Sequence, residues 1–123
     1  MALKTLVLGA SPNPERYAFK AVNMLKKSGH PVVALGGREA MIGDTEIRIG
    51  FPLFEDIDTI TLYLGPKNQI TYYEYILRLN PRRIIFNPGT SNIFLMGLAR
   101  KNGIEIIEDC TLVLLSNKRF EMN

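Results

Sequence analysis

Short apolar runs alternate along the chain with longer segments in which apolar side chains recur at helical spacing. A run of about four to eight apolar residues that ends at a glycine or proline is typical of a strand buried on both faces of a sheet. Runs of this kind cover residues 3–8, 32–35, 59–64, 83–86 and 104–107. A further apolar run, 111–115, follows Cys110, and we also interpret it as a strand.

Three segments between these runs predict helices. The first covers residues 16–28 and is followed by Gly29, which is a typical helix stop. The second covers about 68–79. The third begins at a cap that Thr90 or Ser91 can provide, because serine and threonine hydroxyls accept hydrogen bonds from the first free N–H groups of a helix.

The least periodic part of the chain is 38–57, where we expect a short extended piece at 46–49 and a helical turn at 54–57. Elsewhere strands and helices alternate regularly, and right-handed crossovers then give a parallel sheet with helices on both faces. The length of 123 residues suits one domain. We therefore expect a single α/β domain with a doubly wound sheet of about five parallel strands.

The ends of the predicted strands form the candidate binding site. In doubly wound sheets, ligands bind at the carboxyl ends of the strands, where the direction of winding reverses. Here these ends are the loops at 9–16, 36–38, 65–67 and 87–90, which are rich in glycine, proline or small polar residues. The first three loops also carry a cation, which favours an anionic ligand.

The first loop has the composition of a phosphate-binding turn. Gly9, Ala10 and Ser11 are small, so that backbone N–H groups and the serine hydroxyl can approach phosphate oxygens. The dinucleotide fingerprint G-x-G-x-x-G is not met, because Ser11 and Pro14 stand at its second and third glycine positions. Asn13 lies between two prolines that stiffen the loop. The loop therefore differs from a standard NAD loop, and a strand-to-helix turn without a ligand is the alternative.

Charged residues at the strand ends narrow the ligand class. Arg38, after Gly36 and Gly37, stands where an NAD enzyme places an acidic residue, and an arginine there suits a ribose phosphate. Coenzyme A and NADP both carry such a phosphate, so Arg38 does not choose between them. Arg16 can add positive charge at a pyrophosphate, and Lys67 is a further candidate. Ordinary solvated surface is the alternative for each of these cations.

Other residues carry weaker signals. Asn87 and Gly89 follow the fourth strand, where they either line the cleft opposite the first loop or form a tight turn before a helix. His30 is expected as a turn residue at the opposite end of the sheet. Helical packing is the default interpretation for the tyrosines of the second helix, and Tyr72 and Tyr75 are also candidates for a subunit contact. The pattern does not predict the oligomeric state.

Composition argues against several function classes. A net charge of +3 without a dense Lys/Arg block favours a small anionic ligand over nucleic acid. No apolar run approaches the roughly 20 residues of a membrane span, and the single Cys110 fits a reducing cytoplasm. Clustered metal ligands, a nucleophile elbow and an acid/base pair in the cleft are not evident. We expect binding without catalysis and without a metal.

Several stretches resemble one known family: VLGASPNPERYAFKAVNMLKKSGHPV, TITLYLGPKNQ, and RRIIFNPGTSN followed by KNGIEIIEDCTLVLL. Over nearly its whole length the chain is similar to small bacterial CoA-binding domain proteins, which are relatives of the nucleotide-binding domain of the succinyl-CoA synthetase alpha subunit. The resemblance implies a Rossmann-like domain that binds coenzyme A or a similar adenine nucleotide, with no established activity for the small members. It also implies a phosphate loop at Gly9, Ala10, Ser11, Asn13 and Arg16, with later turns at Pro66 and Gly89.

One departure from the family stands after the second strand. Many members have an Asn-Pro pair there, whereas this chain reads Leu35-Gly36-Gly37-Arg38. The family's adenosine contacts are therefore not transferred to this segment. The predicted role of Arg38 at a ribose phosphate is based only on the chemistry of arginine. The favoured hypothesis is a non-catalytic protein that binds coenzyme A or an acyl-CoA. The alternatives are a small NADP-linked oxidoreductase and an interaction module whose nucleotide pocket is vestigial.

Overall fold

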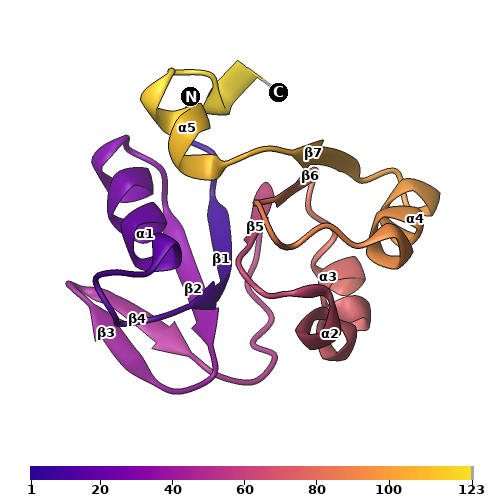
Figure 1. Ribbon diagram of the computed structural model, residues 1–123, viewed down its shortest axis with the longest axis horizontal. Coiled ribbons are helices and arrows are strands. Elements are labelled where there is room, and N and C mark those ends of the chain that lie inside the picture. The colour runs from indigo at the N-terminus through magenta and orange to yellow at the C-terminus, as the bar shows by residue number, and fades with distance from the viewer. Residues whose placement is uncertain (123) are drawn as a thin grey trace.

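The computed structural model describes residues 1–122, which form one seven-stranded sheet flanked by helices (Figure 1). The strands are β1 (Thr5–Ala10), β2 (Val32–Gly36), β3 (Ala40–Ile42), β4 (Thr45–Arg48), β5 (Thr59–Leu62), β6 (Arg83–Phe86) and β7 (Glu105–Glu108). The helices are α1 (Tyr17–Lys27), α2 (Pro66–Gln69), α3 (Tyr73–Leu79), α4 (Ile93–Lys101) and α5 (Thr111–Ser116), with 3₁₀ turns η1 (Ile70–Tyr72) and η2 (Phe120–Met122).

The sheet has the strand order β3-β4-β2-β1-β5-β6-β7. Every neighbouring pair is parallel except β3 with β4, which form an antiparallel hairpin. The α/β class and the doubly wound parallel sheet are therefore confirmed. The sequence missed β3, while the expected extended piece at 46–49 corresponds to β4. Gly43 and Asp44 form the tight turn of the hairpin, and Gly43 has a φ of +59°.

Alternating residues of β1 send their side chains into two cores. Leu6 and Leu8 pack with α3 and α4, whereas Val7 packs with α1 and α5. The side chains of Leu6, Val7 and Leu8 have no exposed surface. Figure 1 shows α1 and α5 together on one side of the sheet and α2, α3 and α4 on the other. Full burial on both faces explains why β1 reads as a continuous apolar run.

The winding direction reverses at β1. The chain passes from β1 through α1 to β2 on one side, and after the hairpin it returns to β5 on the other side of β1. β6 and β7 then extend the sheet in that second direction. The carboxyl ends of β1 and β5 therefore form the switch point, which is where open α/β sheets bind their ligands.

Two expected local structures are wrong. Residues 111–115 form the helix α5 and not a strand, because Thr111, Leu114 and Leu115 then share one buried face against the α1 side of the sheet. A short apolar run fits a strand or a buried helix equally well. The 54–57 segment is irregular and not a helical turn. The expected second helix is present, and it consists of α2, the 3₁₀ turn η1 and α3 in succession.

Two side chains, those of His30 and Tyr75, are buried and have specific hydrogen-bond partners. His30 lies between α1 and β2, as expected, and its buried Nδ1 accepts a hydrogen bond from the Leu3 N–H at 2.9 Å. Tyr75 is only 5% exposed, and its hydroxyl donates to the Pro52 carbonyl at 2.5 Å. The suggestion that Tyr75 takes part in a subunit contact is therefore wrong, because the side chain is already inside the protein.

Candidate functional site

The end of β1 is shaped by a glycine with a left-handed backbone. Gly9 has a φ of +102°, and the register of β1 with β2 shifts between Leu8 and Ala10. A Cβ at Gly9 would lie 2.9 Å from the carbonyl carbon of Tyr63, which is closer than side-chain atoms approach. Glycine therefore lets the β1 end turn against the β5 end, and this brings the first loop to the switch point.

Hydrogen bonds within the loop fix its shape. The Asn13 N–H donates to the Ser11 hydroxyl at 3.1 Å, and the Glu15 N–H donates to Asn13 Oδ1 at 3.0 Å. The Arg16 N–H donates to the Asn13 carbonyl at 3.0 Å. Asn13 thus organises the turn that leads into α1, which is a common role for asparagine in loops.

The N-terminus of α1 is open to an anion. Arg16 is the N-cap residue, its side chain makes no capping hydrogen bond, and the first turn has no acidic residue. Tyr17 and Ala18, the first two helical residues, line the cavity described next. Free N–H groups and the helix dipole make such a terminus attractive to phosphate. The exposed guanidinium of Arg16 adds a full positive charge at the same place.

A cavity of about 510 Å³ lies between the first loop and the loops that follow β5 and β6. This volume is in the range of small-molecule sites. Gly89 has a φ of +90°, and a Cβ there would meet no atom within 4 Å, so its backbone faces open space. The lining residues are Gly9, Ser11, Glu15, Arg16, Tyr17, Ala18, Tyr63, Gly65, Pro88, Gly89 and Thr90.

A buried amide network holds the β5 and β6 loops together. The Gln69 side-chain amide donates to the carbonyls of Leu64 and Thr90, both at 2.8 Å. Asn92 Nδ2 donates to Gln69 Oε1 at 2.9 Å and to the Tyr73 hydroxyl at 2.8 Å. These bonds fix the two loops that form one wall of the cavity.

Asn87 acts behind the cavity and not in its lining. It is 2% exposed, and its Nδ2 donates to the Thr61 hydroxyl and the Leu62 carbonyl, both at 2.7 Å. Its Oδ1 accepts from the Thr111 N–H at 2.8 Å. The whole amide therefore ties β5, β6 and α5 together, and it supports the strand ends from inside.

Tyr63 is one of the residues that line the cavity, and its hydroxyl is buried. Burial raises the pKa of Tyr63 to about 12, and the nearby Thr111 hydroxyl acts in the opposite direction. The phenol therefore stays protonated at neutral pH. Tyr63 therefore adds no charge to the cavity.

The structure brings some of the predicted site residues together and leaves others apart. Gly9, Ser11, Arg16 and Gly89 line the cavity. Gly36 lies beside it in the packing of β1 and β2, since a Cβ on Gly36 would be 2.4 Å from the Ala10 carbonyl oxygen. The predicted residues that do not line the cavity are Ala10, Asn13, Gly36, Arg38, Pro66, Lys67 and Asn87.

Several lining residues were not singled out from the sequence. Tyr63 was taken as part of a strand, although its place two residues before Gly65 at a strand end was a signal for a site position. Thr90 was considered only as a helix cap or loop residue; it is 4% exposed and its hydroxyl donates to the Asn87 carbonyl at 2.8 Å. Glu15 brings a negative charge to the rim.

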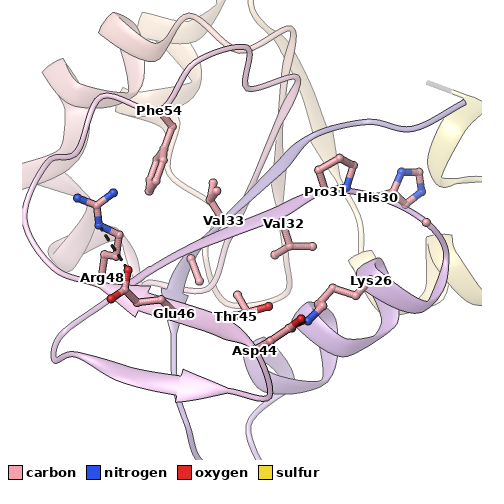
Figure 2. A pocket seen from close by; sticks show the side chains of 12 residues that line it. Lys26, His30, Pro31, Val32, Val33, Asp44, Thr45, Glu46, Arg48 and Phe54 are labelled. Atoms are coloured by element: carbon pink, nitrogen blue, oxygen red, sulfur yellow. Dashed lines mark hydrogen bonds and ion pairs between the residues drawn. The ribbon is translucent and has the colours of Figure 1, made fainter.

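A second, open groove of about 700 Å³ lies at the other end of β2 (Figure 2). Its charged side chains are paired with one another: Lys26 with Asp44, and Arg48 with Glu46 at 4.0 Å. Arg48 also lies over the Phe54 ring, 5.5 Å from its centroid. This groove is at the amino-terminal end of β2 and does not include any of the strand-end loops of the switch point.

Residues 1–122 contain neither a cluster of metal-ligating side chains nor a helix suited to a membrane. No group of three or more His, Cys, Asp or Glu side chains in this range is arranged to hold a metal ion. None of the helices in the described part of the chain has the length and apolar character to cross a membrane.

Comparison with known protein families shows to which family this chain belongs. The model of the CoA binding domain matches residues 4–116, which include the first loop and both walls of the cavity. The chain belongs to the CoA binding domain family. This confirms the resemblance seen in the sequence, and it suggests CoA-related binding. No curated protein matches the chain.

Solved structures agree with this CoA binding domain fold. A crystal structure of an uncharacterized protein is 44% identical, with a TM-score of 0.95 over 98% of this chain and 99% of that one. A Thermus thermophilus protein, cell-free ID.343, is 22% identical, with a TM-score of 0.84 over 97% and 91% of the two chains. A hypothetical protein from Pyrococcus horikoshii OT3 is 21% identical, with a TM-score of 0.85 over 94% and 83%.

Proposed function

We propose that this protein binds coenzyme A or an acyl-CoA at the switch point between β1 and β5, as a binding protein without a reaction of its own. The observation that carries the proposal is the open N-terminus of α1 beside Arg16 in a cavity of ligand size. Membership of the CoA binding domain family supports the choice of ligand class. Coenzyme A would supply a thiol that carries acyl groups.

The pyrophosphate is the part of the ligand that these residues fit best. The N–H groups of the first turn of α1 and the Arg16 guanidinium are donors, and charge-assisted hydrogen bonds from them favour a phosphate oxygen. Gly89 leaves its side of the cavity without a side chain, and Gly9 lets the end of β1 pack closely against the Tyr63 backbone. Ser11 provides a hydroxyl whose oxygen already accepts from the Asn13 N–H, so its proton is free to donate outward.

The other cations would act at the ends of the ligand. Arg38 is exposed just beyond β2, and we assign it to the ribose phosphate that coenzyme A carries. Pro66 and Lys67 begin α2 and are exposed beside Gly65, so they would contact the ligand from the β5 side. An arginine for a ribose phosphate also suits NADP, and the experiment must therefore separate the two ligands.

Isothermal titration calorimetry with coenzyme A, an acyl-CoA, NAD and NADPH tests this function. We expect saturable binding of coenzyme A or the acyl-CoA, and binding that weakens about tenfold or more in Arg16→Ala, because a lost charge-assisted bond costs about 1.5–3 kcal/mol. Arg78→Ala is the matched control, since Arg78 is an exposed arginine at the far end of α3. Binding of NAD or NADPH without coenzyme A would overturn the proposal.

A further inference from the structure

Helix α4 is apolar on two faces. Leu95, Met96 and Ala99 are buried against the sheet. On the outer side, Ile93 is 79% exposed and Phe94 is 74% exposed. A helix that is hydrophobic nearly all round is normally covered on all sides, whereas a helix at the surface of a monomer has a polar outer face. The outer side of α4 therefore has the composition of a covered surface.

The exposed side of α4 forms one wall of an apolar groove. Ile70 and Tyr73 form the opposite wall, and the groove has a volume of about 680 Å³. Ile70 is itself 60% exposed. In Figure 1, α4 lies at the outer edge of the molecule beside α2 and α3, where nothing else in residues 1–122 covers it. A contiguous patch of this kind marks an interaction site.

Gly97 stands at the middle of α4, which runs from Ile93 to Lys101. A Cβ on Gly97 would meet no atom within 4 Å, so packing inside this chain does not require glycine there. Glycine in a helix interior costs about 1 kcal/mol relative to alanine. A second helix crossing at this point would explain the glycine, because the absence of a side chain allows two helices to approach closely.

Opposite charges stand at the two ends of the apolar stripe. Lys101 lines the groove at the C-terminal end of α4, next to Arg100. At the N-terminal end, the carboxylate of Glu108 accepts a hydrogen bond from the Ser91 hydroxyl at 2.9 Å. If α4 met an identical helix in the antiparallel direction, the basic end of each helix would face the acidic residue of the other.

We propose that two copies of this protein associate through α4, around a two-fold axis that passes beside Gly97. Ile93 and Phe94 of one copy pack on Leu98 and the groove of the other, and Lys101 pairs with Glu108 across the interface. In a two-fold contact each surface meets an identical copy of itself. The exposed apolar side of α4, with Gly97 at its centre and Lys101 and Glu108 at opposite ends, is suited to such a contact. The proposal is independent of the ligand bound at the switch point.

Sedimentation equilibrium over a wide concentration range tests this interface. We expect a particle of twice the 13.9 kDa chain mass, and a shift to the monomer in Phe94→Asp. Leu53→Asp is the matched control, because Leu53 is 64% exposed but lies in the β4–β5 connection. Circular dichroism checks that both variants are folded. A wild-type monomer at the highest concentration, or dissociation caused equally by Leu53→Asp, would overturn the proposal.

A charge-swap pair tests the antiparallel geometry without touching the apolar stripe. We expect Lys101→Glu and Glu108→Lys each to raise the dimer dissociation constant, because each places like charges opposite one another. The double variant should return the dissociation constant to the wild-type value, because it again places opposite charges together. A double variant as weak as the single ones would exclude the proposed pairing. If the wild type is monomeric and binds acyl-CoA more tightly as the acyl chain lengthens, the groove holds an acyl chain and the dimer is wrong.

Discussion

At the end of β1, neighbouring main-chain atoms occupy the space that two side chains would need. The Cβ position of Gly36 lies 2.4 Å from the Ala10 carbonyl oxygen, and that of Gly9 lies 2.9 Å from the Tyr63 carbonyl carbon. Both neighbours are backbone atoms, which cannot move aside without distorting the sheet. Gly9 and Gly36 therefore determine how closely the ends of β1, β2 and β5 approach one another beside the proposed site.

We expect Gly36→Ala to lower the free energy of unfolding by about 2 kcal/mol or more, because its methyl group must displace backbone. Gly37→Ala is the control, since a Cβ there meets nothing within 4 Å and the residue is exposed. Urea denaturation of both variants measures the difference. Equal stability of the two variants would show that β1 and β2 are not packed as described.

His30 is held in its neutral form by its contacts. Its Nδ1 accepts the Leu3 N–H, and its ring packs against Phe120 with centroids 4.9 Å apart. Burial lowers the pKa of His30 below the usual 6.5, and Glu121, with Oε1 3.4 Å from Nε2, opposes this shift only in part. The folded protein thus takes up the His30 proton less readily than the unfolded chain.

Stability should consequently fall as the solution becomes acidic. The contribution of His30 is complete above the unfolded-state pKa of 6.5 and is lost as the pH falls through the lower pKa of the folded state. We expect the urea midpoint of the wild type to decrease through this interval and that of His30→Gln to change less. Parallel midpoint curves for the two proteins would rule out His30 as the titrating group.

At the scale of elements, the start of α4 depends on one asparagine. Asn92 Oδ1 accepts from the N–H groups of Phe94 and Leu95 at 3.0 and 3.3 Å, while its amide nitrogen joins the network of Gln69 and Tyr73. Because Asn92 is 6% exposed, water cannot easily replace these bonds. The same side chain therefore caps a helix and fixes a wall of the site.

We expect Asn92→Ala to destabilise the protein by about 2–4 kcal/mol, since it removes a helix cap and leaves buried polar partners without hydrogen bonds. Ser91→Ala is the control, because Ser91 is exposed and its hydroxyl donates to the exposed Glu108. Thermal unfolding of both variants is the measurement. A loss in Ser91→Ala as large as that in Asn92→Ala would mean that the cap lies elsewhere.

The cap also shows what a sequence can and cannot predict about elements. Alternating apolar runs and helical spacing were enough to predict the parallel sheet and its helices. They did not distinguish Asn92 from Thr90 and Ser91, because all three residue types are good caps. The Thr111–Ser116 helix was missed for a similar reason, since its burial depends on contact with α1, which is far away in the chain.

At the scale of the whole molecule, the rule for strand ends predicted the part of the site that the backbone determines. Gly9, Ser11, Arg16 and Gly89 share one cavity because β1 and β6 end at the same edge of the sheet. Asn87 was proposed for the ligand, but its amide is engaged by Thr61 and Thr111, whose positions no local pattern reveals. The order of strands and helices was therefore predicted better than the direction of individual side chains at the strand ends.

NMR titration of ¹⁵N-labelled protein with coenzyme A tests most directly where the ligand binds. We expect the largest amide shifts at Gly9, Ser11, Arg16, Gly65 and Gly89, because these residues line the cavity at the switch point. Shifts centred on Val33 and Arg48 at the second groove, or no shifts at saturating coenzyme A, would contradict the account.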